Sequence, residues 1–162
     1  MRHKISLVLF VIYISVLIPA TTNAVDVSEF VTVVPIEGVF SDVKERVIFA
    51  VESQGLVVDH TSDVGGMLSR TGKDLGENGT IYENAEVLEF CSALYSRRMA
   101  EFSPTLLAFC PYAISVYTLD GEPYTTYVAF KLIARNVADD ATREVLQQID
   151  DLLKAIVEEA SL

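Results

Sequence analysis

Apolar positions along this chain recur with two periods, one typical of helices and the other of strands. The helical period predicts helices over residues 42–54, 92–102 and 140–159. Ser41 is the expected N-cap of the first helix, and Gly55 is its expected stop. The last helix carries the broadest apolar stripe, so one of its faces must pack against another layer of the protein.

Short segments rich in β-branched and aromatic residues alternate with these helices and predict strands. They lie at residues 30–36, 56–59, 85–91, 113–118 and 124–133. The Asp120-Gly121 turn signal predicts a hairpin, so at least the last two strands are antiparallel. The order strand, helix, strand, loop, strand, helix, strand, strand, helix predicts an α+β fold. It is a two-layer sandwich in which helices pack on one face of a small, mainly antiparallel sheet.

The segment between residues 60 and 80 is rich in Gly, Ser, Thr and Asp, and it predicts a loop. Val64, Met67 and Leu68 predict one or two helical turns inside it, capped by Ser62 or Asp63. A loop of this length is often functional or mobile.

The N-terminus has the pattern of a secretory signal peptide. Two basic residues precede an apolar run over residues 7–18, and a small-x-small cleavage site ends at Ala24. The run is shorter than the ~20 residues of a membrane-spanning helix, so we expect cleavage rather than an uncleaved anchor. We therefore predict a signal peptide over residues 1–24 and a single α+β domain over residues 25–162. The location is periplasmic or secreted, with no membrane span after cleavage.

Charge and motifs narrow the classes of function. The chain has 12 basic and 23 acidic residues and a net charge of -11, which disfavours nucleic acid and anionic lipid as partners. The sequence contains no G-x-S-x-G, no P-loop and no H-E-x-x-H motif. Hydrolase or kinase chemistry therefore has no support, and a non-enzymatic role is favoured.

The stretch EFCSALYSRRMAEFSPTLLAFCPY holds both cysteines, Cys91 and Cys110, and three interpretations are open. In an oxidising compartment the pair would form a disulfide, whose loop of about 20 residues is worth ~3 kcal/mol. As a shared ligand or redox site, Cys91 gains from its place at a helix N-terminus, which favours thiolate. As inert core thiols, both follow a phenylalanine at apolar positions, where free cysteines are often buried.

His60 is the one histidine that remains after signal cleavage, and it ends a predicted strand. It is either a surface residue in a turn or a third ligand beside the two cysteines. With Met67 or Met99 as a soft fourth ligand, such a set suits copper or zinc, or an axial position on haem. No C-x-x-C spacing supports a particular ion, so the cofactor stays unknown.

Two further side chains are secondary candidates. Arg70, within Ser69-Arg70-Thr71-Gly72, is either an anion ligand or a solvent-exposed loop residue. Tyr95 shares a predicted helix face with Met99 and Cys91. Other tyrosines are expected to pack on strands with their hydroxyls at the rim. They are Tyr112, Tyr117, Tyr124 and Tyr127.

A set of motifs resembles the domain of unknown function 302 family. The motifs are AVESQGLVVDH, ML-x-RTG at residues 67–72, NAEVLEFCSALYSRRM, and FCPYAISVY at residues 109–117 with the strand after it. They cover about residues 30–135 and leave the C-terminal helix outside. The resemblance implies a small antiparallel sheet with helices on one side, a homodimer and a redox, sulfur-related context. It implies no particular reaction.

Three functions follow from these observations. The first is an exported, non-enzymatic module that binds a small ligand, metal or cofactor near Cys91, Cys110 and His60. The second is a thiol-disulfide redox or sulfur-carrier protein, with Cys91 as nucleophile and Cys110 as its resolving partner. The third is a purely structural dimerisation domain. The concentration of soft ligand atoms favours the first.

Overall fold

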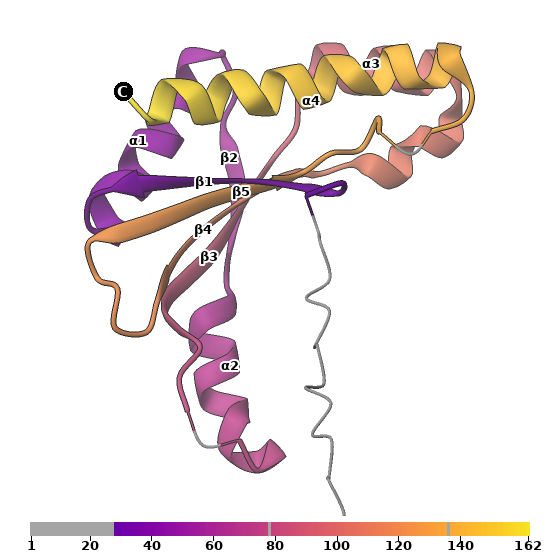
Figure 1. Cartoon of the computed structure of the whole chain (residues 1–162). Coiled ribbons are helices and arrows are strands. Elements are labelled where there is room, and N and C mark those ends of the chain that lie inside the picture. Colours follow the sequence, from indigo (N-terminus) through magenta and orange to yellow (C-terminus); the bar gives the residue numbers. More distant parts are fainter. Residues whose placement is uncertain (1–27, 78, 136) are drawn as a thin grey trace, which may run out of the picture.

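The computed structural model describes residues 28–77, 79–135 and 137–162 (Figure 1). The predicted signal peptide lies outside these residues. The elements in chain order are β1 (Val31–Glu37), α1 (Phe40–Ser53), β2 (Val58–Asp63), α2 (Val64–Gly72), the 3-10 helix η1 (Lys73–Leu75), β3 (Tyr82–Phe90), α3 (Ala93–Phe102), the 3-10 helix η2 (Pro104–Phe109), β4 (Tyr112–Leu119), β5 (Thr125–Lys131) and α4 (Asp140–Ala160).

The described strands form one antiparallel sheet in the order β1-β5-β4-β3-β2. Strands β2 to β5 follow one another across it, and β1 joins on the far side of β5, where Val31 lies opposite Lys131. Pro35 stands in this edge strand, which suits a residue without an N–H to donate. The predicted hairpin between β4 and β5 is confirmed, and Gly121 takes the left-handed conformation there with φ 81°.

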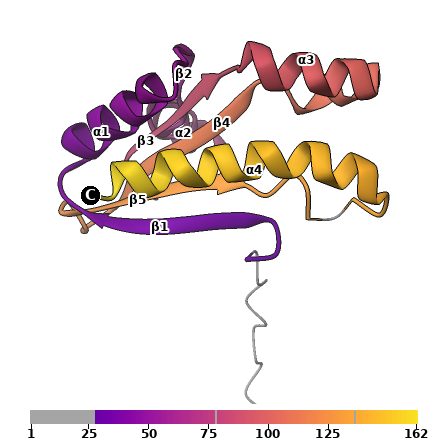
Figure 2. The ribbon, with the colours of Figure 1, turned by 90° about the horizontal axis from the view of Figure 1, so that it is seen from above.

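Helices α1, α3 and α4 form a layer on one side of the sheet, as Figure 1 shows. Seen from above, α1 and α4 lie over the strands, and α3 continues the layer beyond one end of the sheet (Figure 2). The predicted α+β sandwich with helices on one face is therefore confirmed. Helix α2 is the exception, because it extends from the end of β2 away from the helical layer.

The core lies between the sheet and this helical layer. Alternate residues of the central strands point into it, and so do the apolar stripes of α1 and α4. Burying each such side chain stabilises the fold by about 1.5–3 kcal/mol. Those least exposed include Leu88, Phe90, Ile114, Val116, Val128, Val43, Val47, Leu146, Ile149 and Ile156.

Asp150 is the charged residue of α4 that faces this core, and it joins the helix to the chain that leaves β5. Its Oδ1 accepts a hydrogen bond from the N–H of Ile133 at 2.9 Å, and its Oδ2 accepts one from the N–H of Ala134 at 3.1 Å. Burial raises the pKa of Asp150, and the two backbone donors oppose that shift. The carboxylate thus satisfies two backbone groups that the sheet cannot.

Several predicted boundaries are wrong by a few residues. Helix α1 begins at Phe40, and Ser41 is not its cap, because the N-cap position is Val39, for which the described residues provide no side-chain hydrogen bond. Strand β2 extends to Asp63, so His60 lies inside the strand and not at its end. The turns predicted within the loop are found as the nine residues of α2, and Asp63, one of the two predicted caps, is confirmed: its Oδ1 accepts from the N–H of Gly66 at 2.7 Å.

Two other differences affect the neighbourhood of the cysteines. Strand β3 ends at Phe90, so Cys91 follows the strand instead of ending it. The chain from Pro104 to Phe109 is a 3-10 helix, which the apolar run after Pro104 did not predict.

No helix in the described ranges is long and apolar enough to cross a membrane.

A candidate thiol site

Cys91 and Cys110 come together at one end of the sheet. Strands β3 and β4 are neighbours with Phe90 opposite Tyr112, so the residues just after β3 and just before β4 meet. Both cysteines are described and neither is bonded to the other; Cys91 is exposed and Cys110 is partly buried. The structure therefore brings the two thiols together without a disulfide, and an exposed Cys91 does not fit the core-thiol interpretation.

The surroundings of Cys91 oppose its ionisation. Partial burial is the largest cause of a raised pKa at Cys91, followed by the Cys110 thiol, through its charge and a side-chain hydrogen bond, and by the charge of Asp59. The backbone N–H of Tyr112 donates to the sulfur and acts in the other direction. The place of Cys91 before a helix N-terminus predicts a lowered pKa, but the balance of these effects raises the pKa instead.

Two hydroxyl groups complete the cluster around Cys110. The Oγ of Ser96 lies 3.5 Å from the Sγ of Cys110 and 3.4 Å from the hydroxyl oxygen of Tyr112, and in each pair either atom can donate. Tyr112 is 3% exposed, and burial is the main cause that raises its pKa to about 12. Its hydroxyl also has a side-chain hydrogen bond with Cys110. We call Cys91, Cys110, Ser96 and Tyr112 the thiol site.

Local structure explains why these four side chains converge. Ser92 caps α3 by accepting from the N–H of Tyr95 at 3.4 Å, and Ser96 follows one turn later, on the same side of the helix. The Cys110-Pro111 peptide bond, which is cis, joins η2 to β4. Ser96 was not among the residues singled out from the sequence, and Tyr112 was expected to pack on a strand with its hydroxyl at the rim. The signal available was their spacing from the two cysteines across a predicted helix and strand.

His60 does not complete a ligand set with the two thiols. It is exposed in β2 and pairs with Glu89 of β3. Within residues 28–77, 79–135 and 137–162, no three side chains of His, Cys, Asp or Glu are close enough to one another to hold a metal ion. The predicted combination of one imidazole and two thiolates is therefore not assembled in this structure.

Met99 and Tyr95 belong to the packing of α3. Met99 is 1% exposed and lies in the core. Tyr95 packs against the core, and the Arg98 guanidinium carbon lies 5.8 Å from the centroid of its ring. Phe102, the last residue of α3, is 46% exposed. These contacts give Met99 and Tyr95 structural roles.

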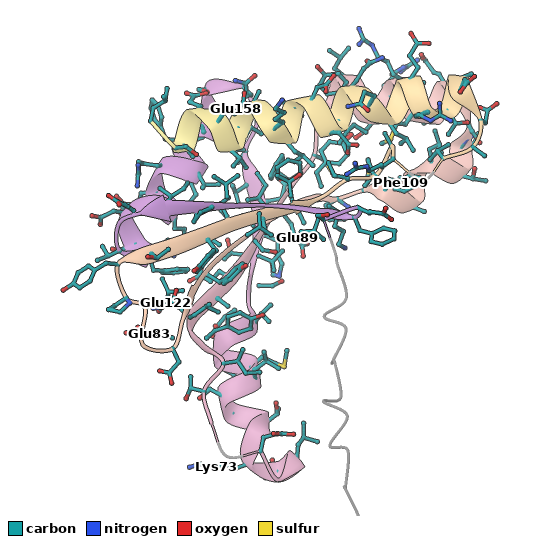
Figure 3. All side chains as sticks on the ribbon, in the orientation of Figure 1. Lys73, Glu83, Glu89, Phe109, Glu122 and Glu158 are labelled. Carbon is teal, nitrogen blue, oxygen red and sulfur yellow. The ribbon has the colours of Figure 1, made fainter. Side chains whose placement is uncertain are left out.

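Met67 and Arg70 lie on α2, whose residues are all described and none of which is buried. Met67 is 42% exposed, and Arg70 forms an exposed ion pair with Asp63 at 3.7 Å. We call α2 and η1 together, residues 64–75, the α2 arm. In Figure 3, Lys73 of η1 lies at the tip of this arm, and Phe109, the residue before Cys110, lies far from it at the other end of the sheet. A cavity of about 240 Å³ between α2 and the start of β3 has mostly apolar walls, including Leu68, Leu75 and Ile81.

Comparison with known proteins places this fold. Residues 32–160 match the family model described as "Domain of unknown function DUF302". The chain belongs to the DUF302 family. The match includes α4, which the sequence motifs left outside. A crystal structure titled as an uncharacterized conserved DUF302 protein from Bacillus stearothermophilus shares this DUF302 fold. Its TM-score is 0.68 at 20% sequence identity, over 81% of this chain and 98% of that one. No curated protein is significantly similar to this chain.

Proposed function

We propose that this DUF302 domain is a binding module for a soft metal ion, held between Cys91 and Cys110, and that Cu(I) is the ion it fits best. The observation that supports the proposal is the contact between two thiols from different segments, one of them exposed. Thiolate sulfur favours soft ions such as Cu(I), which is stable with two ligands. A structural zinc site needs four ligands, and the described residues offer no third His, Cys, Asp or Glu.

Binding is coupled to proton release. Each thiol gives up its proton when its sulfur coordinates the ion, so two protons leave for each Cu(I) bound. The raised pKa of Cys91 means that protons compete with the metal at neutral pH. The affinity for Cu(I) therefore increases as the pH rises toward that pKa.

The test is a titration of the reduced protein with Cu(I) in competition with a chelator of known affinity. We expect one ion per chain, and loss of most of the affinity in Cys91→Ser and in Cys110→Ser. His60→Ala and Met67→Ala are the matched controls and keep the wild-type affinity. Equal copper retention by the wild type and the double Cys91→Ser, Cys110→Ser variant would refute the proposal.

A reversible disulfide is the second candidate, because the same contact and the exposure of Cys91 also suit oxidation. The two thiols would lose two protons and two electrons to a small disulfide oxidant, which becomes two thiols. The raised pKa of Cys91 gives no support to its role as an activated nucleophile, in redox or in sulfur transfer. A thiol count after treatment with such an oxidant, before and after denaturation, separates this candidate from metal binding.

Export and assembly are further parts of the proposal. The N-terminal residues support a periplasmic or secreted location, and the family resemblance supports a homodimer. N-terminal sequencing of the exported protein is expected to begin at Val25. Light scattering gives the mass in solution. A dimer that neither binds copper nor oxidises would favour a structural dimerisation domain instead.

A further inference from the structure

The hydrogen bonds of the thiol site are unequally divided between its two sulfur atoms. Cys110 has two hydroxyl neighbours, Ser96 at 3.5 Å and Tyr112, and these two hydroxyls lie 3.4 Å from each other. Cys91 has the backbone N–H of Tyr112 and the Cys110 thiol as its hydrogen-bond partners. The two cysteines are therefore not equivalent ligands.

We infer that Ser96 and Tyr112 are positioning residues, whose hydroxyls hold the sulfur of Cys110 as the inner ligand of the site. Cys91 is then the outer ligand, which meets an incoming ion from solvent. The inference rests on the proposed function for the identity of the ion. It concerns the same site and assigns the two thiols different roles.

The chemistry of a thiolate explains why two hydroxyls matter. When Cys110 loses its proton to coordinate an ion, its sulfur becomes an acceptor with negative charge, and the hydroxyls of Ser96 and Tyr112 can both turn to donate to it. Hydrogen bonds to a charged acceptor are stronger than neutral ones, particularly when the donor is buried, as the Tyr112 hydroxyl is. No new group has to move in, because both oxygens are already within contact distance.

The rigidity of the two donors comes from different layers of the fold. Tyr112 starts β4, and its ring packs edge-to-face on Phe90 with centroids 6.3 Å apart. Ser96 lies in the first turns of α3, behind the Ser92 cap. The sulfur of Cys110 is thereby fixed between the sheet and the helical layer.

The experiment measures the rate at which Cu(I) leaves the loaded protein for an excess of chelator. Ser96→Ala and Tyr112→Phe are each expected to release copper roughly ten-fold faster than the wild type, because each removes one donor to a charged acceptor. Ser96→Thr keeps the hydroxyl and restores the wild-type rate. The matched controls are Ser115→Ala on β4 and Tyr127→Phe on β5, and both keep the wild-type rate.

A second measurement does not depend on copper. In the Cys91→Ser background, alkylation of Cys110 by iodoacetamide is expected to slow with Ser96→Ala and to recover with Ser96→Thr. If wild-type protein binds no copper but this alkylation pattern is seen, the proposed ion is wrong and the positioning role stands. If copper binds and neither rate responds to Ser96→Ala or Tyr112→Phe in correctly folded protein, the positioning role is refuted.

Discussion

The thiol site and the α2 arm lie at opposite ends of the same sheet, and both contain residues that the sequence singled out as candidate ligands. Side chains from several segments come together at the thiol site but not on the α2 arm. At the thiol site, side chains from α3, β4 and the segments around them converge, and the neighbouring Met99 is 1% exposed. On α2, Met67 is 42% exposed and Arg70 reaches an exposed carboxylate across 3.7 Å. A methionine is thus held in the core in one region and exposed to solvent in the other.

The contrast shows that side chains converge where the core holds them in place. Tyr112 and Met99 are held by the core, so the groups beside them have fixed positions. Helix α2 has no buried residue among its nine, all of which are described, so few contacts hold its side chains in place. A functional site needs the first condition, because a ligand must be met by groups that are already oriented.

The largest expected effect separates the two methionines. Met99→Ala removes a buried side chain and should lower the free energy of unfolding by about 2–5 kcal/mol. Met67→Ala removes an exposed one, and we expect a change within about 0.5 kcal/mol. Denaturant unfolding of the two variants measures both. A large loss in Met67→Ala would mean that α2 is buried in solution, by a partner or a second copy.

A smaller effect is expected from Tyr112 at high pH. The pKa of Tyr112 is raised from 10.0 to about 12 in the folded protein, so the folded state keeps its proton where the unfolded state loses it. This contribution is fully present below pH 10 and is lost as the pH rises toward 12. Over that range the wild type should lose about 1–2 kcal/mol more stability than Tyr112→Phe. The measurement is urea unfolding of both proteins at pH 10 and at pH 12. Equal losses of stability in the wild type and Tyr112→Phe would contradict the burial of this hydroxyl.

The smallest effect concerns the charge of Asp59 beside Cys91. Asp59 is the last of the causes that raise the pKa of Cys91, so Asp59→Asn should shift the alkylation profile of Cys91 to lower pH without removing the whole elevation. Asp63→Asn, at the α2 end of the same strand, is the control and leaves the profile in place. The measurement is the rate of iodoacetamide labelling against pH in the Cys110→Ser background. An alkylation profile that is unchanged by Asp59→Asn would mean that this carboxylate is too far from the sulfur to affect the pKa of Cys91.

Hydrophobic periodicity and local cap and turn signals together predicted most of the fold. The stripe of α4, the Gly55 stop and the hairpin at Gly121 follow from local rules, and each is found where expected. The sequence did not predict that α2 would be a full helix without a buried face, because glycine-rich composition is typical of loops. The hydrogen bonds of Asp150 with the backbone of Ile133 and Ala134 were also not predictable from the sequence, because tertiary packing brings these residues together.

The candidate site was predicted in part. Cys91 and Cys110 were singled out because both flank one predicted helix, but whether they meet depends on the pairing of β3 with β4, which the sequence left open. His60 was joined to them on chemistry alone, and its pairing with Glu89 could not be read without the register of β2 and β3. The sequence alone does not distinguish Ser96 from the other serines. Its position on α3, beside the sulfur of Cys110, is visible only in the structure. Residue type is visible in a sequence, and mutual distance is not.

The pairing of β1 with β5 has a consequence for the order in which the chain can fold. The first strand of the domain, beginning at Val31, finds its partner only at Thr125–Lys131, after every other strand has been made. Because the chain is synthesised from its N-terminus, β1 stays unpaired through most of synthesis. Strands β2 to β5, in contrast, pair with strands next to them in sequence. Strands β2, β3 and β4 can therefore pair early, whereas closure of the β1 edge is a late event, because it requires β5.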